Sequence, residues 1–305
     1  MVKKHHAIKK TRGEQIFDVC NVIFLLLIAF VTVFPFIMIV SGSLSDINYL
    51  VRNEVFFYPK GFTLEGYKEV IEDGQIFQAY YNTIFYTVVG TCINLLVTMA
   101  AAYPLSRKGY KYRNPIMMFI SFTMFFSGGM VPTYLLINQL GLYNTRWVML
   151  LPGAVSVTNL VMARVFLSSN IPDELSESAK IDGANDFQIF FRIVLPLSKA
   201  IIAVLALYYG VGHWNEFFKP MLYLRDAELT PLALYLRRLL VIGGTNYSSS
   251  QLSDSMMIQD PIAVAGITER IKYCSIIITM LPILFIYPFF QKYFSKGVMI
   301  GALRA

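Results

Sequence analysis

The most constraining feature of this sequence is a set of long runs that contain no charged residue. The run from Val19 to Ser45 has 27 residues, Gly74 to Ser106 has 33, and Asn114 to Thr145 has 32. A helix needs about 20 apolar residues to cross a bilayer, because lipid offers backbone polar groups no hydrogen-bond partner. Such runs predict an all-α integral membrane protein. They exclude a soluble enzyme, a disordered chain and an outer-membrane barrel, whose strands alternate over about ten residues.

Three shorter charge-free runs extend the pattern. They have 17, 16 and 19 residues and begin at Trp147, Ala200 and Tyr273. Together the runs predict six transmembrane helices, over residues 17–41, 80–104, 115–138, 147–167, 199–222 and 272–292. The basic start followed by an apolar stretch could also be a signal peptide. Its apolar part exceeds the usual 7–15 residues and no A-x-A site follows it, so an uncleaved first helix is expected.

The distribution of basic residues predicts the orientation. With the N-terminus in the cytoplasm, 16 of the 26 Lys and Arg residues fall on the cytoplasmic side, where short loops of membrane proteins carry such an excess. The prediction is a multi-pass protein of a bacterial-type cell membrane with both termini cytoplasmic. The net charge of +7 indicates topology and not nucleic-acid binding, since no basic face with interleaved aromatics lies outside the membrane.

This reading divides the chain into three parts. They are a basic cytoplasmic N-terminus over 1–16, a six-helix membrane domain over 17–292, and a cytoplasmic tail over 293–305. The membrane domain carries outer loops at 42–79 and 223–271 and an inward loop at 168–198.

The inward loop carries the signals of a short amphipathic helix. Asn170 is a candidate cap and Pro172 suits the first turn, while Gly183 can end the helix in a left-handed conformation. Negative charge favourable to a helix N-terminus comes from Asp173, Glu174 and Glu177. The face expected to be apolar carries Leu175, Ser178 and Ala179. On these signals alone, the segment is either an interfacial linker or a docking element.

The same loop matches a family pattern. Glu177-Ser178-Ala179, then Gly183, then Ile193-x-Leu195-Pro196 resembles the E-A-A…G…I-x-L-P loop of ABC-importer permeases, with Ser178 in place of the middle alanine. Asn82-Thr83 through Ala102-Tyr103-Pro-Leu-Ser-Arg107 and Trp214-Asn215-Glu216-Phe217 resemble segments of carbohydrate-importer permeases. Segments 126–135 and 291–301 look like the subgroup related to complex-polysaccharide transport permeases.

The resemblance implies a fold and a set of partners. The fold is that of a type I ABC importer permease, and the cargo is an oligosaccharide or glycan. The partners are a second homologous permease subunit, two cytoplasmic ABC ATPase subunits, an extracytoplasmic solute-binding (lipo)protein and membrane lipid. ATP and Mg would bind the partner ATPase. No cofactor is expected here, because the chain has no G-x-x-x-x-G-K-[ST] phosphate loop, and the subunit is expected to be non-catalytic.

The resemblance also assigns residues to two contact regions. Those expected to couple to the ATPase are Glu174, Glu177, Ser178, Ala179, Asp182 and Gly183. Those expected to contact the binding protein are Gly243, Gly244, Thr245, Asn246 and Tyr247.

Polar and aromatic side chains within the spans predict the cargo path. Such groups are costly in lipid and face a cavity or another helix, and sugars need both hydrogen-bond partners and flat apolar faces. The candidates are Asn82, Asn94, Asn159, Tyr208, Tyr209, Trp214, Asn215 and Glu216. Each could instead stabilise a helix contact. His213 is expected to be a packing residue, and Glu216 an ion-pair partner of Lys219.

Two other functions remain as alternatives. One is an ABC permease for a non-sugar solute, and the other is a self-sufficient secondary carrier. The carrier would require internal repeats or buried ion relays, and neither is evident. No metal-ligand spacing is present, so no metal site is predicted.

Overall fold

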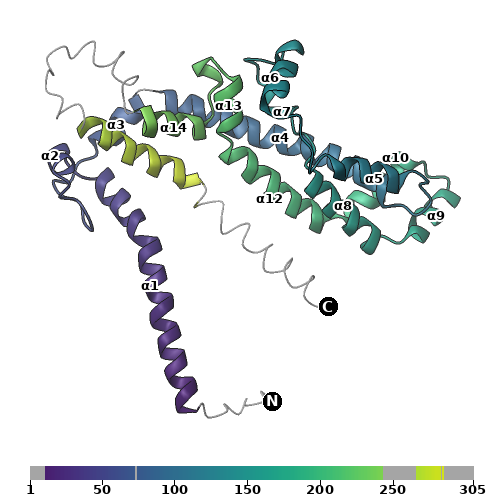
Figure 1. Ribbon diagram of the computed structural model, residues 1–305, viewed down its shortest axis with the longest axis horizontal. Coiled ribbons are helices and arrows are strands. Elements are labelled where there is room, and N and C mark those ends of the chain that lie inside the picture. Colours follow the sequence, from purple (N-terminus) through teal and green to yellow (C-terminus); the bar gives the residue numbers. More distant parts are fainter. Residues whose placement is uncertain (1–10, 73, 243–265, 283, 285–305) are drawn as a thin grey trace. The chain divides into compact units, whose positions relative to one another are not determined.

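The computed structural model describes residues 11–72, 74–242, 266–282 and 284, and every regular element in these ranges is a helix (Figure 1). The chain divides into two compact units. The first combines Met1–Glu72 with Gly244–Ile278, and the second combines Asp73–Gly243 with Thr279–Ala305.

The first unit begins with the long helix α1, Arg12–Ser43. Thr11 and Glu14 cap its start reciprocally, each side chain accepting the other's backbone N–H, at 3.3 and 2.7 Å. Its large apolar side chains are exposed along most of the helix, as expected of a helix that faces lipid. The unit continues with α2, Ile47–Val51, and α3, Glu65–Glu72, and residues 266–278 add a further helical segment.

A buried arginine joins the two distant pieces of the first unit. Arg270 is 3% exposed and forms ion pairs with Glu65, at 3.0 Å, and with Glu69. Cys274 lies beside it and donates to the carbonyl of Ser43. Both carboxylates stand on α3, so this helix is fixed to the segment that contains Arg270.

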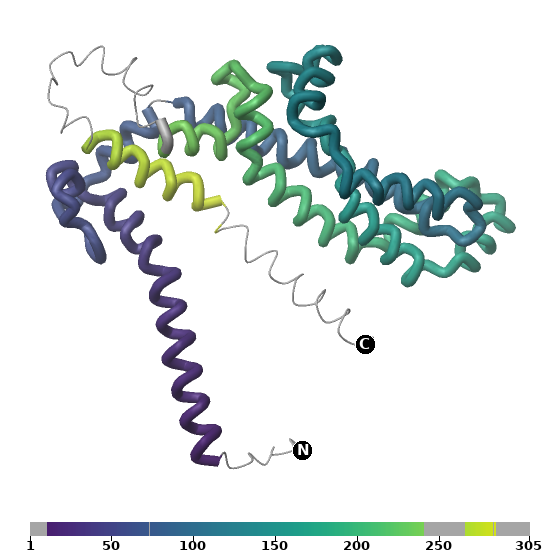
Figure 2. The backbone as a smooth tube through the Cα atoms, viewed as in Figure 1, coloured from purple at the N-terminus to yellow at the C-terminus, as the bar shows by residue number. Residues whose placement is uncertain are grey.

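The second unit is built around α4, Gln75–Ser106, with α12, Lys199–Asn215, and α8, Val157–Asn170, packed along it (Figures 1 and 2). The buried side chains between them include Met99, Leu160, Leu167, Ile189 and Leu205. The remaining helices are α5, Arg113–Phe122; α6, Met130–Gln139; α7, Trp147–Leu150; α9, Asp173–Ile181; α10, Asp186–Ile189; α11, Leu195–Leu197; α13, Phe218–Tyr223; and α14, Leu232–Ile242. Two further turns are the π-helical η1, Phe190–Val194, and the 3₁₀ turn η2, Ala227–Leu229.

A glycine sets the close approach of α4 and α12. A Cβ atom on Gly90 would lie 2.5 Å from Nε2 of His213, so only glycine fits there. The same imidazole nitrogen lies 2.7 Å from Oδ1 of Asn94, one turn further along α4. His213 is therefore a hydrogen-bonded packing residue, as expected from the sequence, and small residues allow this contact as they do between membrane helices generally.

The predicted spans are only partly continuous. Among the described residues, α1 and α4 are long and apolar enough to cross a membrane. The helices α10–α11 and α12 together would form a third span, bent by 81°. The unbroken helices predicted over 115–138, 147–167 and 199–222 are wrong, because each of these segments consists of two helices in the structure: α5 and α6, α7 and α8, and α12 and α13.

A proline accounts for the π-helical turn before the bend. Pro196 has no N–H to donate to the carbonyl four residues earlier, and its ring would clash with that carbonyl. The chain widens before it, and the N–H of Leu195 donates to the carbonyl of Phe190, five residues back. Ser198 then bonds the carbonyl of Val194 through its side chain, at 2.7 Å, at the point where the helix bends.

Candidate functional site

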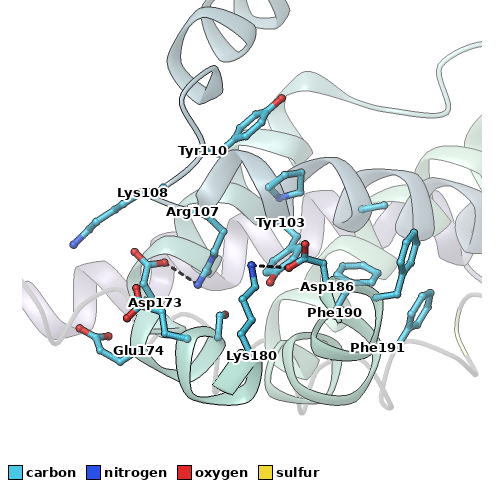
Figure 3. Close-up of a pocket in the computed structure, with 16 residues that line it drawn as sticks. Tyr103, Arg107, Lys108, Tyr110, Asp173, Glu174, Lys180, Asp186, Phe190 and Phe191 are labelled. Carbon is cyan, nitrogen blue, oxygen red and sulfur yellow. Dashed lines mark hydrogen bonds and ion pairs between the residues drawn. The ribbon is translucent and has the colours of Figure 1, made fainter. Parts of the chain in front are cut away.

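A cavity of about 850 Å³ lies between the C-terminal end of α4 and the short helices that follow α8 (Figure 3). Its walls combine aromatic rings with charged groups. Tyr103 and Arg107 come from α4 and its C-terminal cap, Glu174 and Lys180 from α9, and Phe190 from η1. The cavity thus lies at the loop that the sequence identifies as a docking element.

Helix α9 forms where the sequence predicts it and ends at Gly183. Gly183 has φ +84°, a left-handed conformation that L side chains rarely adopt. Its N–H donates to the carbonyl of Lys180 at 3.0 Å, and the N–H of Ala184 donates to that of Ala179 at 2.9 Å. This is a Schellman motif, which satisfies the last carbonyls of the helix.

The predicted N-terminal cap of α9 is wrong, because Asn170 belongs to the preceding helix. Asn170 is the last residue of α8, and its side chain donates to the carbonyl of Phe166 at 2.9 Å. The residue before α9 is Pro172, which has no side-chain cap to offer. The first turn is instead stabilised from outside the helix, by an arginine described below.

Of the face of α9 that is expected to be apolar, only Ala179 is buried. Leu175 is 37% exposed, whereas Ser176 and Ala179 are buried. The inward face is therefore offset from the one that carries the leucine, because α9 packs through its small residues. Of the predicted coupling residues, Ala179 is buried, and the exposed ones are Glu174, Glu177, Ser178, Asp182 and Gly183.

Arg107, at the end of α4, holds α9 and α8 together. Its Nη1 donates to Oδ1 of Asp173 and to the carbonyl of Ile171, both at 3.1 Å, and its Nη2 donates to the carbonyl of Leu167 at 3.0 Å. The guanidinium also lies 5.4 Å from the ring centroid of Tyr103. One side chain, 13% exposed, thus satisfies C-terminal carbonyls of α8 and the first acidic residue of α9. We call this set of contacts the Arg107 clamp.

A second ion pair in the same cavity is far more exposed. Lys180 Nζ lies 2.9 Å from Oδ1 of Asp186, but the side chains are 57% and 70% exposed. The hydrogen bond to Asp186 raises the pKa of Lys180, so its ammonium stays charged at physiological pH. Figure 3 shows both pairs among the residues that line the cavity. Solvent screens such an exposed pair and leaves it little net stabilisation.

Two large apolar side chains project from this region to the surface. Ile181, at the end of α9, is 87% exposed, and Phe187, on α10, is 78% exposed. Asn185 and Gln188 cap α10 reciprocally, at 2.8 and 3.0 Å, which fixes the turn that carries Phe187. The surface therefore offers apolar and acidic groups together on an ordered support.

The predicted path residues on α4 make interhelical contacts. Asn82 is fully buried and donates to the carbonyls of Glu228 and Thr230, at 2.6 and 3.1 Å. Asn94 donates to the carbonyl of Ala154 at 2.7 Å, in addition to its bond with His213. Asn82 thus holds η2 and the residue after it against α4, and Asn94 holds the turn between α7 and α8 against it.

Of the predicted path residues on other helices, some pack against neighbouring helices and others are exposed. Tyr209 shares a 2.7 Å hydrogen bond with Thr98 and accepts the N–H of Ser156 at 3.1 Å. Asn159 is buried on α8, whereas Tyr208 is 54% exposed. The structure therefore does not bring all the candidates to one surface.

The remaining candidates lie at a break between α12 and α13. The helix ends at Asn215, Glu216 has extended backbone dihedral angles, and α13 begins at Phe218. Trp214 is half-buried, and Asn215 is exposed with its amide donating to the carbonyl of Val211. Glu216 lies 3.8 Å from Lys219, the ion pair expected from the sequence.

The predicted binding-protein contact, Gly243 to Tyr247, lies outside the described residues. Within the described ranges, no group of three or more His, Cys, Asp or Glu residues is arranged to hold a metal ion.

The role of Arg107 is the one that sequence reasoning missed. Arg107 ends the segment that resembles carbohydrate-importer permeases, but its partners are 60 to 66 residues away. The available signal was Asp173, an acidic residue directly after a proline and next to a basic loop.

Comparisons with known proteins agree over nearly the whole chain. A family model described as "Binding-protein-dependent transport system inner membrane component" matches residues 75–300. Protein LplC of Bacillus subtilis is 40% identical over 299 residues, covering 98% of this chain and 98% of LplC. The polygalacturonan/rhamnogalacturonan transport system permease protein YtcP of the same organism is 35% identical over 292 residues, covering 95% of this chain and 99% of YtcP.

A solved structure shares the fold. It is a bacterial ABC transporter involved in the import of the acidic polysaccharide alginate, and the matched chain is 30% identical with a TM-score of 0.86. The match covers 94% of this chain and 100% of that chain.

Proposed function

This chain belongs to the family of inner membrane components of binding-protein-dependent transport systems, and from that premise we propose that it is a permease subunit of an ATP-driven oligosaccharide importer. Its relatives include permeases named for polygalacturonan and rhamnogalacturonan, arabinooligosaccharides and lactose. In this proposal the cargo is an oligosaccharide or glycan. The chain crosses the cell membrane six times, with broken helices in the third, fourth and fifth spans and with both termini in the cytoplasm.

The subunit itself carries no catalytic group in this proposal. It forms half of the path with a second homologous permease, and two separate ATPase subunits bind ATP and Mg. An extracytoplasmic binding protein delivers the cargo. Alternating access then arises from rigid-body displacement of the membrane helices, driven by the ATPase.

The observation that carries the proposal is the construction of α9. A two-turn helix with exposed Glu174 and Glu177 would be marginal in isolation, yet here it is fixed at its start by Arg107 and at its end by Gly183. A displacement applied to α9 would therefore reach α4 and α8 directly, instead of being absorbed by a flexible loop. This is what a coupling element requires.

Exposed groups around α9 support a protein partner. Glu177 is free to pair with a basic residue, and Ile181 and Phe187 offer apolar contact beside it. Charge at the rim with apolar groups at the centre is typical of protein interfaces.

Site-directed crosslinking in the assembled transporter tests the proposal. Glu177→Cys should crosslink to an ATPase subunit, with a yield that changes when ATP is bound, because the contact shifts with the transport cycle. Lys111→Cys, exposed on a different loop, is the matched control and should not respond to ATP. Uptake of an oligosaccharide by vesicles that contain this chain and no ATPase would contradict the proposal.

A further inference from the structure

The loop between α2 and α3 carries a cluster of exposed aromatic side chains. We call the segment Asn53–Phe62 the aromatic loop, and its exposed rings are those of Phe56, Phe57, Tyr58 and Phe62, with exposed fractions of 49% to 68%. Keeping such large apolar rings hydrated is unfavourable. An exposed apolar cluster of this kind marks an interaction surface.

Backbone contacts fasten the base of the aromatic loop to the end of α1. The N–H of Asp46 donates to the carbonyl of Lys60, and the N–H of Thr63 donates to the carbonyl of Leu44, both at 3.0 Å. Gly61 has φ +63°, and a Cβ atom there would lie 2.9 Å from Cβ of Asp46, so the turn requires glycine. The loop is therefore an ordered element with a defined tip.

The tip of the aromatic loop lies beside α1. The ring centroid of Phe57 is 5.3 Å from that of Phe34 and 6.5 Å from that of Phe30. Phe34 precedes the end of α1 at Ser43 by nine residues, which is about 13 Å along a helix. Phe30 and Phe34 both belong to the charge-free run of a helix that is long and apolar enough to cross a membrane. The tip therefore lies level with part of this span.

The charges of the aromatic loop suit the boundary of a bilayer. Its charged residues are Glu54 and Lys60, which pair with each other at 3.4 Å. The ammonium of Lys60 also lies 5.9 Å from the ring centroid of Tyr49. Irregular backbone exposed to lipid is excluded from the hydrocarbon core, whereas aromatic residues are enriched at the membrane–water interface. A neutral, aromatic loop is thus expected at that interface.

We propose that the aromatic loop inserts into the bilayer, with its rings at the headgroup–acyl boundary of the leaflet nearest the C-terminal end of α1. The occupant of this surface is lipid, because the loop extends the exposed apolar face of α1 and has no net charge for a protein partner to complement. Insertion fixes the depth of α1 in the membrane. Only the choice of leaflet rests on the proposed function, whose topology makes it the outer one.

The accessibility of a spin label to oxygen and to a nickel chelate tests the insertion, because oxygen concentrates in lipid and the chelate in water. The assembled transporter is studied in lipid nanodiscs with unlabelled partner subunits, and the exposed Cys20 and Cys92 are replaced by alanine. One label is attached at Tyr58→Cys. The matched control is Lys68→Cys on α3, in the same unit, where the side chain is 75% exposed.

The ratio of oxygen accessibility to nickel accessibility is the measured quantity. Insertion at the boundary buries a side chain by about 5–10 Å, so the ratio at position 58 should exceed that at position 68 by at least about threefold. A label at Phe62→Cys gives an independent measure of the depth of the loop and should show the same excess.

Phe57→Ala tests whether packing on α1 holds the tip at this depth. It removes the ring that contacts Phe34 and should lower the ratio at position 58 towards that at position 68. Phe24→Ala removes another exposed ring from α1, away from the loop contact, and should leave the ratio unchanged. If Phe57→Ala fails to assemble, the labels at positions 58 and 62 still decide the insertion.

Each outcome has a defined meaning. Equal ratios at positions 58 and 68 would place the tip in water and overturn the proposal. A label at position 58 that neither reagent reaches would mean that protein covers the loop, which also overturns it. An unchanged ratio in Phe57→Ala would overturn the role of α1 in positioning the tip. The proposed function is judged separately, by the crosslinking of Glu177→Cys to the ATPase.

Discussion

Replacing Arg107 should release α9 while leaving the rest of the second unit folded. Arg107→Ala removes an ion pair to Asp173 and donors to two carbonyls. Hydrogen bonds to charged groups make a net contribution of about 1.5–3 kcal/mol each when they are buried. Asp173 is 30% exposed, so water would recover part of that loss. We therefore expect the docking of α9 to weaken by about 2–3 kcal/mol, a factor of roughly 30 to 150 in its undocked population.

Hydrogen exchange measured by mass spectrometry on the assembled transporter reads this population directly, because amides of a locally opened helix exchange in proportion to it. The protection factors of peptides from α9 should fall by at least about tenfold, while those of peptides from the middle of α4 should be unchanged. Transport per ATP hydrolysed should fall together with protection in α9, since a loosened lever no longer transmits the displacement.

The second ion pair of the cavity provides the control. Lys180–Asp186 has the shorter separation, 2.9 against 3.1 Å, but is exposed to water. Lys180→Ala should therefore change exchange in α9 by much less, consistent with the 0–1 kcal/mol typical of surface pairs. If Lys180→Ala loosens α9 as much as Arg107→Ala, then burial does not decide the strength of these contacts and the reasoning is wrong.

Three further predictions concern other parts of the chain. Gly183→Val should uncouple transport from ATP hydrolysis more than Gly183→Asn. A side chain at this position meets open space, so only the φ of +84° disfavours it, and asparagine tolerates that φ better than valine. Equal uncoupling of the two variants in vesicles would contradict this reasoning. Trp214→Ala should lower oligosaccharide uptake more than assembly; equal loss of both, judged by co-purification of partners, would indicate packing alone. Arg270→Met should destabilise the first unit by about 1.5–3 kcal/mol, the contribution of hydrogen bonds to charged groups, because it removes a buried cation whose partners Glu65 and Glu69 can return to water, and it should lower the temperature of thermal aggregation. Lys272→Met removes a less buried cation, paired with Glu269 at 3.0 Å, and should shift that temperature far less; an equal shift would refute the argument.

Local signals in the sequence predicted the parts of the fold that local physics decides. Charge-free runs locate α1 and α4, because lipid excludes unpaired charge and unpaired backbone wherever a helix crosses. Turn chemistry placed the end of α9 at Gly183, since a left-handed residue has a strong preference for glycine. Both inferences depend only on a few neighbouring residues, so the tertiary contacts of the rest of the chain do not change them.

Some inferences that depended on tertiary contact failed. The predicted face of α9 was that of Leu175, but in a nine-residue helix the buried face is set by what it packs against, and here the small Ser176 and Ala179 face inward. Hydropathy also does not register a break such as the one at Glu216, because the residues on both sides remain apolar. The partners of Arg107 lie 60 to 66 residues further along the chain, beyond the reach of any periodic pattern.

The pairing of Arg270 with Glu65 and Glu69 has a consequence for the order of synthesis. The first unit consists of two segments that are far apart in the sequence. About 170 residues of the second unit, Asp73–Gly243, leave the ribosome between them. During that interval Glu65 and Glu69 of α3 lack their basic counterion, and their ion pairs form only when the segment that contains Arg270 has been made. Nascent chains halted before residue 266 should accordingly leave α3 open to added protease, and the released full-length chain should protect it.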